Sequence, residues 1–179
     1  MFTKQRIPNL LTFGRVLAVP LALALMAWNV GTWPLLLLFA AAAITDFFDG
    51  YLARKWNAVS PLGTMLDPIA DKLLVALMLF YLAVVTQLAL LPIALILLRE
   101  LYISGLREFL ALRGVALPVS KGGKWKTAVQ MLAILVLYSA DALKIPELWD
   151  SGMVLLWISV ALAIWSAAQY TRAAWPNLR

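Results

Sequence analysis

The chain has 179 residues, of which 64% are hydrophobic and 13% are charged, and its net charge is +6. This composition lies far outside the range of soluble globular domains and predicts an integral membrane protein. Cysteine and histidine are absent, which excludes a disulfide framework and any metal site built on thiolate or imidazole ligands. Any bound metal must therefore be held by oxygen atoms.

Charge-free stretches mark the predicted membrane helices, because one span needs about 20 largely apolar residues. Residues 16–45 are too long for one span, and the segment NVGTWP within them supplies a turn and a new helix start. The segment TQLALLP divides residues 73–98 in the same way. We expect one integral membrane catalytic domain over residues 1–179, an all-α bundle of six transmembrane helices. These helices should begin near Pro8, Trp33, Pro61, Leu90, Gly123 and Ser151.

Basic residues predict the orientation of these spans. Lys4 and Arg6 precede the first helix as in a signal peptide, but Arg15 interrupts the apolar stretch, so we expect an uncleaved span. Lys144 is the only basic residue on one side of the membrane, which places both termini and the other loops in the cytoplasm. The net charge then reflects topology and attraction to anionic lipid, and gives no reason to expect a nucleic-acid partner. The cytoplasmic basic residues are Arg54, Lys55, Arg113, Lys121, Lys124, Lys126, Arg172 and Arg179.

Four aspartates interrupt the apolar pattern in the segment TDFFDGYLARKWNAVSPLGTMLDPIADK. Asp46 and Asp49 share a face of one helix, and Asp67 and Asp71 share a face of the next. With a turn at residues 57–61, Asp49 and Asp67 each lie about 9 to 12 Å from the turn, so the two pairs face each other at one depth. Such an all-oxygen cluster suits Mg²⁺ or Mn²⁺. The small residues that leave room for a bulky ligand on the same faces are Gly50, Ala53 and Gly63.

A purely structural role is the alternative for these aspartates, with Arg54, Lys55 and Lys72 as ion-pair partners near the cytoplasmic rim. Ionisable residues inside a membrane are costly and usually functional, which favours a site. A divalent cation would also relieve the mutual repulsion of the carboxylates.

The same segment resembles the CDP-alcohol phosphatidyltransferase family, whose signature is D-x-x-D-G-x-x-A-R followed by G-x-x-x-D-x-x-x-D. The resemblance implies transfer of a phosphatidyl group from a CDP-lipid to an alcohol, six transmembrane helices, a divalent metal centre and a homodimer. It also implies a location in the bacterial inner membrane, with the active site facing the cytoplasm. Every fixed position of the signature is present, at Asp46, Asp49, Gly50, Ala53, Arg54, Gly63, Asp67 and Asp71.

The resemblance further implies a role for each residue of the signature. The four aspartates would hold two Mg²⁺ or Mn²⁺ ions, which clamp the pyrophosphate of CDP-diacylglycerol and stabilise charge on the departing CMP. Asp71 would also be the general base that takes the proton from the acceptor hydroxyl. The residues expected to contact the CDP-lipid are Asp49, Gly50, Ala53, Arg54 and Gly63.

Two basic stretches, RELYISGLREFLALRG and VSKGGKWKTAVQM, supply candidate ligands for a phosphate on the acceptor. Arginine offers bidentate donors and lysine a point charge, and the N-terminal dipole of a helix also favours an anion. As an alternative, Arg107 pairs with Glu100 or Glu108, and the lysines serve only membrane topology. The candidates are Arg99, Arg107, Lys124 and Lys126.

These stretches and the opening IPNLLTFGRVLAVPL resemble the branch of the family that uses sn-glycerol 3-phosphate and gives phosphatidylglycerophosphate and CMP, within phosphatidylglycerol and cardiolipin biosynthesis. The resemblance covers Ile7 to about Met131. Asn9, Thr12 and Arg15 recur at a spacing of three and are candidates for the acceptor pocket, although Asn9 also suits a helix cap.

Two rival functions remain. A small divalent-cation transporter could use the aspartates as its ion site, but no inverted hydropathy repeat or matched pair of broken helices supports it. A sister phosphatidyltransferase could accept inositol phosphate, serine or phosphatidylglycerol. Serine and phosphatidylglycerol offer no phosphate monoester for the basic residues, whereas inositol phosphate does.

Overall fold

The computed structural model describes the backbone of residues 6–56, 61–115 and 121–177, and the side chains of residues 13–46, 66, 68–115 and 122–177. Over these ranges the chain forms six α-helices and one short 3₁₀ helix, with no strand. The elements are α1 (Arg6–Ala27), α2 (Thr32–Trp56), α3 (Pro61–Thr86), α4 (Leu90–Leu112), α5 (Lys121–Leu143), α6 (Pro146–Ala174) and η1 (Trp175–Asn177). The prediction of an all-α chain with six helices is confirmed.

The helix boundaries follow glycine and proline. Gly31 separates α1 from α2 with a φ of +86°, which only glycine adopts readily, as the NVGTWP segment predicted. The starts predicted at Pro61 and Leu90 are confirmed. The last helix begins at Pro146 and not near Ser151, because proline fits the first turn of a helix, where its missing N–H is not needed.

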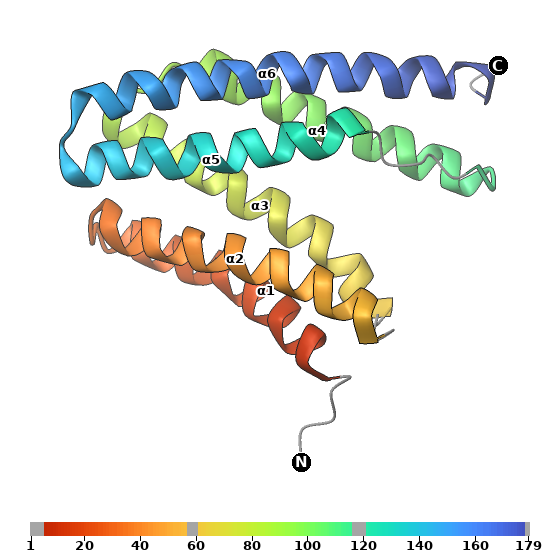
Figure 1. Cartoon of the computed structure of the whole chain (residues 1–179), viewed down its shortest axis with the longest axis horizontal. Helices are drawn as coiled ribbons and strands as arrows, with labels where there is room; N and C mark the ends of the chain where they lie inside the picture. Colours follow the sequence, from red (N-terminus) through yellow and green to blue (C-terminus); the bar gives the residue numbers. More distant parts are fainter. Residues whose placement is uncertain (1–5, 57–60, 116–120, 178–179) are drawn as a thin grey trace.

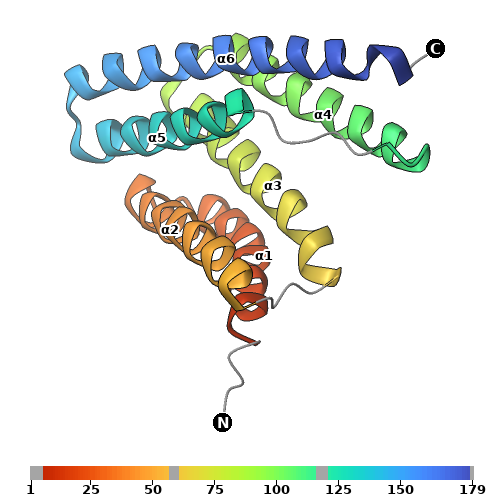
Figure 2. The ribbon, with the colours of Figure 1, turned by 45° about the vertical axis from the view of Figure 1, so that its right-hand side comes forward.

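The six helices form two groups (Figures 1 and 2). α1 packs against α2 and α3, whereas α6 packs against α4 and α5. Contacts between α2 and α5, and of α3 with α4 and α5, join the two groups. In both views α3 crosses obliquely between them. The connections α1–α2, α3–α4 and α5–α6 all lie toward the left-hand end of Figure 1.

The main apolar core lies at the end where these three connections are. It draws on the C-terminal halves of α1, α3 and α5 and the N-terminal halves of α2, α4 and α6. The Tyr138 hydroxyl donates a hydrogen bond of 3.0 Å to the Met78 carbonyl oxygen and so ties α5 to α3. Toward the other end α3 diverges from α4, and charged side chains lie between the groups.

The outer surface of the described part is strongly apolar. Within it, three helical segments are long and apolar enough to cross a membrane, namely Pro68–Thr86, Gly122–Leu143 and Pro146–Asn177. Leu17, Leu101 and Val84 are among many large apolar side chains that are mostly exposed, which water would not tolerate over so large an area. The chain is therefore a membrane protein.

Candidate active site

An ion pair joins α1 to α2 at the first aspartate of the motif. Arg15 is only 4% exposed, and its Nη1 atom contacts Oδ1 of Asp46. A buried guanidinium requires such an acidic partner, because an unpaired charge in packed protein is costly. The pair brings a residue predicted for the acceptor pocket onto a predicted metal ligand. Beside it is a cavity of about 310 Å³ lined by Gly14, Arg15, Ala18, Leu38, Ala41, Ala42 and Thr45.

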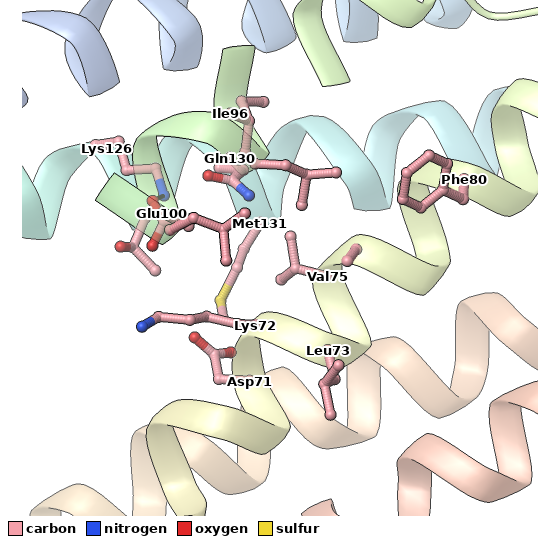
Figure 3. Close-up of a pocket in the computed structure, with 14 residues that line it drawn as sticks. Asp71, Lys72, Leu73, Val75, Phe80, Ile96, Glu100, Lys126, Gln130 and Met131 are labelled. Atoms are coloured by element: carbon pink, nitrogen blue, oxygen red, sulfur yellow. Dashed lines mark hydrogen bonds and ion pairs between the residues drawn. The ribbon is translucent and has the colours of Figure 1, made fainter. Parts of the chain in front are cut away.

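A second cavity, of about 270 Å³, lies between α3, α4 and α5 (Figure 3). Glu100 of α4 and Lys126 of α5 lie on one side of it, and Asp71 and Lys72 of α3 lie on the other. These polar side chains gather at one end of the cavity, while Phe80 lies at its other end. The cavity is therefore charged at one end and apolar along the rest, an arrangement that suits an amphipathic ligand. The apolar lining also includes Leu73, Val75, Ala76, Ile96, Leu97, Leu101 and Met131.

Glu100 is the centre of the charged end. Its Oε1 atom accepts hydrogen bonds from Lys126 Nζ at 2.5 Å and from Arg99 Nη1 at 2.8 Å. Lys126 is 3% exposed and Glu100 retains only 18% of its side-chain surface, so this is a protected cation–carboxylate cluster. Two of the four candidate phosphate ligands therefore converge from different helices on one anionic oxygen. An acceptor phosphate has the same charge sign and the same oxygen chemistry as that carboxylate.

Asp71 faces this cluster across the cavity. The charged groups that act on its carboxylate are Asp46, Arg15, Lys126 and Glu100. Asp71 thus lies within electrostatic reach of both the α1–α2 ion pair and the cluster on α4 and α5. Next to it, Lys72 Nζ contacts Ser104 Oγ of α4, which links the two sides of the cavity.

The other two candidate phosphate ligands are placed differently. Arg107 does not pair with either glutamate within the described residues: its Nη2 atom donates to the Tyr170 hydroxyl at 3.0 Å, and its guanidinium lies 5.1 Å from the centre of the Tyr170 ring. Lys124 is exposed at the start of α5. The pairing of Arg107 with a glutamate, the alternative considered from sequence, is thus replaced by a contact with α6.

The sequence profile of the family described as CDP-alcohol phosphatidyltransferase matches residues 5–165 of the chain. The chain belongs to that family. A CDP-diacylglycerol–glycerol-3-phosphate 3-phosphatidyltransferase of Rickettsia bellii is 46% identical, over 94% of this chain and 95% of that one. A protein of the same name from Cereibacter sphaeroides is 36% identical over 97% of both chains. A cardiolipin synthase (CMP-forming) of Oryza sativa subsp. japonica is 39% identical, over 94% of this chain and 57% of that one.

CDP-alcohol phosphatidyltransferases depend on a divalent cation, and the donor chemistry of the described site fits one. Asp46 and Asp71 offer hard carboxylate oxygens from two helices and act on each other electrostatically. Among the described side chains, no three acidic residues gather into a metal-binding group. Asp49 and Asp67 are not among those side chains, so the four-aspartate cluster stays a prediction.

The side chains of several predicted site residues are outside the described part of the chain. The backbone of these residues belongs to α1, α2 or α3. They are Asn9, Thr12, Asp49, Gly50, Ala53, Arg54, Gly63 and Asp67.

Sequence reasoning missed three polar side chains that hold the site's cations. The sequence suggests Glu100 only as a partner of Arg107, although a glutamate directly beside Arg99 in a largely apolar helix is a signal for a buried pair. Ser166 receives a hydrogen bond of 2.6 Å from Arg99 Nη2, and Tyr170 receives the one from Arg107. Both were visible only as part of the segment WSAAQYTRAAW, which has no sequence pattern tied to chemistry.

Proposed function

We propose that this CDP-alcohol phosphatidyltransferase transfers the phosphatidyl group of CDP-diacylglycerol to sn-glycerol 3-phosphate, giving phosphatidylglycerophosphate and CMP. The observation that carries the proposal is the likeness, over nearly the whole of both chains, to relatives that bear this activity as their name. The product belongs to phosphatidylglycerol and cardiolipin biosynthesis.

The donor half of the reaction is assigned to the aspartate motif. Asp46, Asp49, Asp67 and Asp71 hold two divalent ions, Mg²⁺ or Mn²⁺, whose positive charge neutralises the pyrophosphate and the departing CMP. The small residues of the motif admit the cytidine and ribose, and Arg54 lies near the phosphates. In support, carboxylates are the only anionic donors available to a metal in a chain without cysteine or histidine.

The acceptor half is assigned to the cations of α4 and α5. Arg99, Arg107, Lys124 and Lys126 bind the phosphate of glycerol 3-phosphate, with Asn9, Thr12 and Arg15 toward the glycerol. Asp71 takes the proton from the acceptor hydroxyl while the oxygen of that hydroxyl attacks the lipid-linked phosphorus and displaces CMP. The position of Asp71 across the cavity from Lys126 supports this division, because the acceptor's phosphate and hydroxyl lie at opposite ends of a three-carbon molecule.

The membrane arrangement follows from the distribution of charge. The chain forms one catalytic domain of six transmembrane helices in the bacterial inner membrane, with both termini and the active site on the cytoplasmic side. It acts as a homodimer, and the acyl chains of the donor remain in the inner leaflet. The concentration of lysine and arginine on one side supports the orientation.

Cardiolipin synthesis, the activity in the name of the rice relative, is the second candidate. It would take phosphatidylglycerol as acceptor, whose phosphate is a diester. Two cations that converge on one carboxylate oxygen favour the more highly charged phosphate monoester of glycerol 3-phosphate.

Release of CMP by the purified chain tests the proposal directly. The assay supplies CDP-diacylglycerol and Mg²⁺ with one labelled acceptor at a time: glycerol 3-phosphate, phosphatidylglycerol, inositol phosphate or serine. Of the four acceptors, we expect rapid turnover only with glycerol 3-phosphate, and nearly complete loss of it in a matched Asp71→Asn preparation. Preferential turnover of another acceptor would assign the chain to a sister activity, and Mg²⁺ transport without CMP release would reject the enzyme altogether.

A further inference from the structure

Polar side chains join α4 to α6 along their contact. From the first contact to the last, residue numbers rise on both segments, so α4 and α6 run in parallel, although the two middle contacts, to Thr171 and Tyr170, come in reverse order. In order along α4, the contacts are Arg99 to Ser166 at 2.6 Å, Tyr102 to Thr171 at 2.8 Å, Arg107 to Tyr170 at 3.0 Å, and Arg113 to the Asn177 carbonyl at 3.1 Å.

Two of these contacts differ from the rest in burial and in partner. Ser166 is 0% exposed and Tyr170 is 4% exposed, and they lie one turn apart on the same face of α6. Their partners, Arg99 and Arg107, are the two arginines assigned to the acceptor phosphate. The contact between Tyr102 and Thr171, in contrast, is exposed and joins two uncharged side chains.

The geometry of both contacts restricts the guanidinium groups. Ser166 donates its own hydroxyl proton to the Ala163 carbonyl at 3.2 Å, which leaves its oxygen lone pairs for Arg99 Nη2. Tyr170 holds Arg107 both through its hydroxyl and through the face of its ring. Each arginine is thereby held by α6 at its Nη2 atom. Its Nε donor is buried and has no hydrogen-bond partner among the described residues.

A free arginine side chain loses much rotamer freedom when it binds a phosphate, and a guanidinium that is already held in place loses less. We propose that Ser166 and Tyr170 are positioning residues, which hold Arg99 and Arg107 in the orientation that binds the acceptor phosphate. The inference rests on the proposed function, since it needs a phosphate-bearing acceptor. Neither residue lies within the match to the family's sequence profile, which ends at residue 165.

Steady-state kinetics of the purified full chain tests the inference. Tyr170→Phe removes the hydroxyl but keeps the ring, and Ser166→Ala removes the other acceptor with little change of volume. Loss of one hydrogen bond to a charged group corresponds to about a tenfold rise in the KM for glycerol 3-phosphate. We expect the KM for CDP-diacylglycerol to stay within about twofold, because the two hydrogen bonds that are removed both hold arginines assigned to the acceptor.

Tyr102→Phe is the matched control, since it deletes a tyrosine hydroxyl from the same helix contact without releasing an arginine. It should leave both KM values unchanged. A double-mutant cycle supplies the second readout: in an Arg107→Ala background, Tyr170→Phe should add no further rise in the acceptor KM.

The outcomes separate the two levels of the argument. An unmodified chain that releases no CMP with glycerol 3-phosphate refutes the proposed function and this inference with it. An active chain in which Tyr170→Phe and Ser166→Ala leave the acceptor KM unchanged, or raise both KM values equally, refutes only the inference. Additive effects of Arg107→Ala and Tyr170→Phe would do the same.

Discussion

Replacing Lys126 by methionine isolates the charge that the site contributes to acceptor binding. Lys126 is 3% exposed and its Nζ atom lies 2.5 Å from Glu100. Methionine keeps an unbranched apolar stem of similar length, so the packing of α5 is largely retained. Glu100 is not left unpaired, because Arg99 still contacts the same oxygen at 2.8 Å. The cost in stability should therefore be about 1–3 kcal/mol, below the 3–5 kcal/mol of an orphaned buried charge.

The effect on acceptor binding follows from the charge-assisted contact that is lost. Such a contact contributes about 1.5–3 kcal/mol, which corresponds to a loss of about 10- to 150-fold in kcat/KM for glycerol 3-phosphate. The assay varies glycerol 3-phosphate at saturating CDP-diacylglycerol, and then the reverse. We expect the KM for the CDP-lipid to change little.

Lys144→Met is the matched control. Lys144 also pairs with a carboxylate, that of Asp141 at 2.9 Å, but its side chain is 76% exposed. An exposed pair of this kind contributes about 0–1 kcal/mol, so both activity and stability should be retained. If Lys126→Met stays folded and its kcat/KM for glycerol 3-phosphate remains within twofold, or if both substrates are affected equally, Lys126 does not bind the acceptor phosphate.

Three further predictions follow from the aspartates, the orientation and the helix packing. Asp71→Asn should lower turnover by about 10²- to 10⁴-fold and keep CDP-lipid binding. Asp49→Asn should abolish both turnover and CDP-lipid binding, and so should chelation by EDTA. Addition of Mg²⁺ or Mn²⁺ should reverse the effect of EDTA but not that of the substitution. Equal loss of lipid binding in the two variants would remove the separate role of Asp71. In the naturally cysteine-free chain, a cysteine at Val30 should be labelled from outside the cell and one at Ser120 only after permeabilisation; the reverse pattern would invert the topology. A Cβ on Gly152 would lie 2.7 Å from a side-chain carbon of α5, so Gly152→Val should destabilise the protein by about 1–3 kcal/mol and lower its thermal stability with unchanged KM values.

The helices could be predicted because their signals are local. A glycine that adopts positive φ at Gly31 and a proline that opens α3 at Pro61 act on their own segments, and the sequence alone reveals both. The start of α6 was predicted too late because the apolar run was measured from Ser151. Pro146 is itself a signal for a helix start. The helix extends over residues 146–150, before the apolar run, because the charged residues there do not prevent helix formation.

The partners of the charged residues could not be predicted, because they depend on how helices rotate against one another. Helical periodicity shows which residues share a face, but it does not show which neighbouring helix that face meets. Arg15 could therefore be assigned to a face, and its contact with Asp46 could not be foreseen. Arg99 of α4 and Ser166 of α6 are separated along the chain by the whole of α5, and no pattern in either segment indicates that they meet.

The position of the apolar core at one end of the bundle determines where the molecule can deform. Near the three helix connections, tightly packed side chains such as Met78 and Leu137 hold the two helix groups together, and separating them would forfeit many van der Waals contacts at once. Near Asp71 the contact of Lys72 with Ser104 bridges the groups, and a polar contact of this kind contributes only about 0.5–3 kcal/mol. We therefore expect hydrogen exchange to be slowest at the packed end. If the two helix groups separate to admit a lipid from the bilayer, we expect them to do so at the opposite end, around Asp71, where the fold can remain intact.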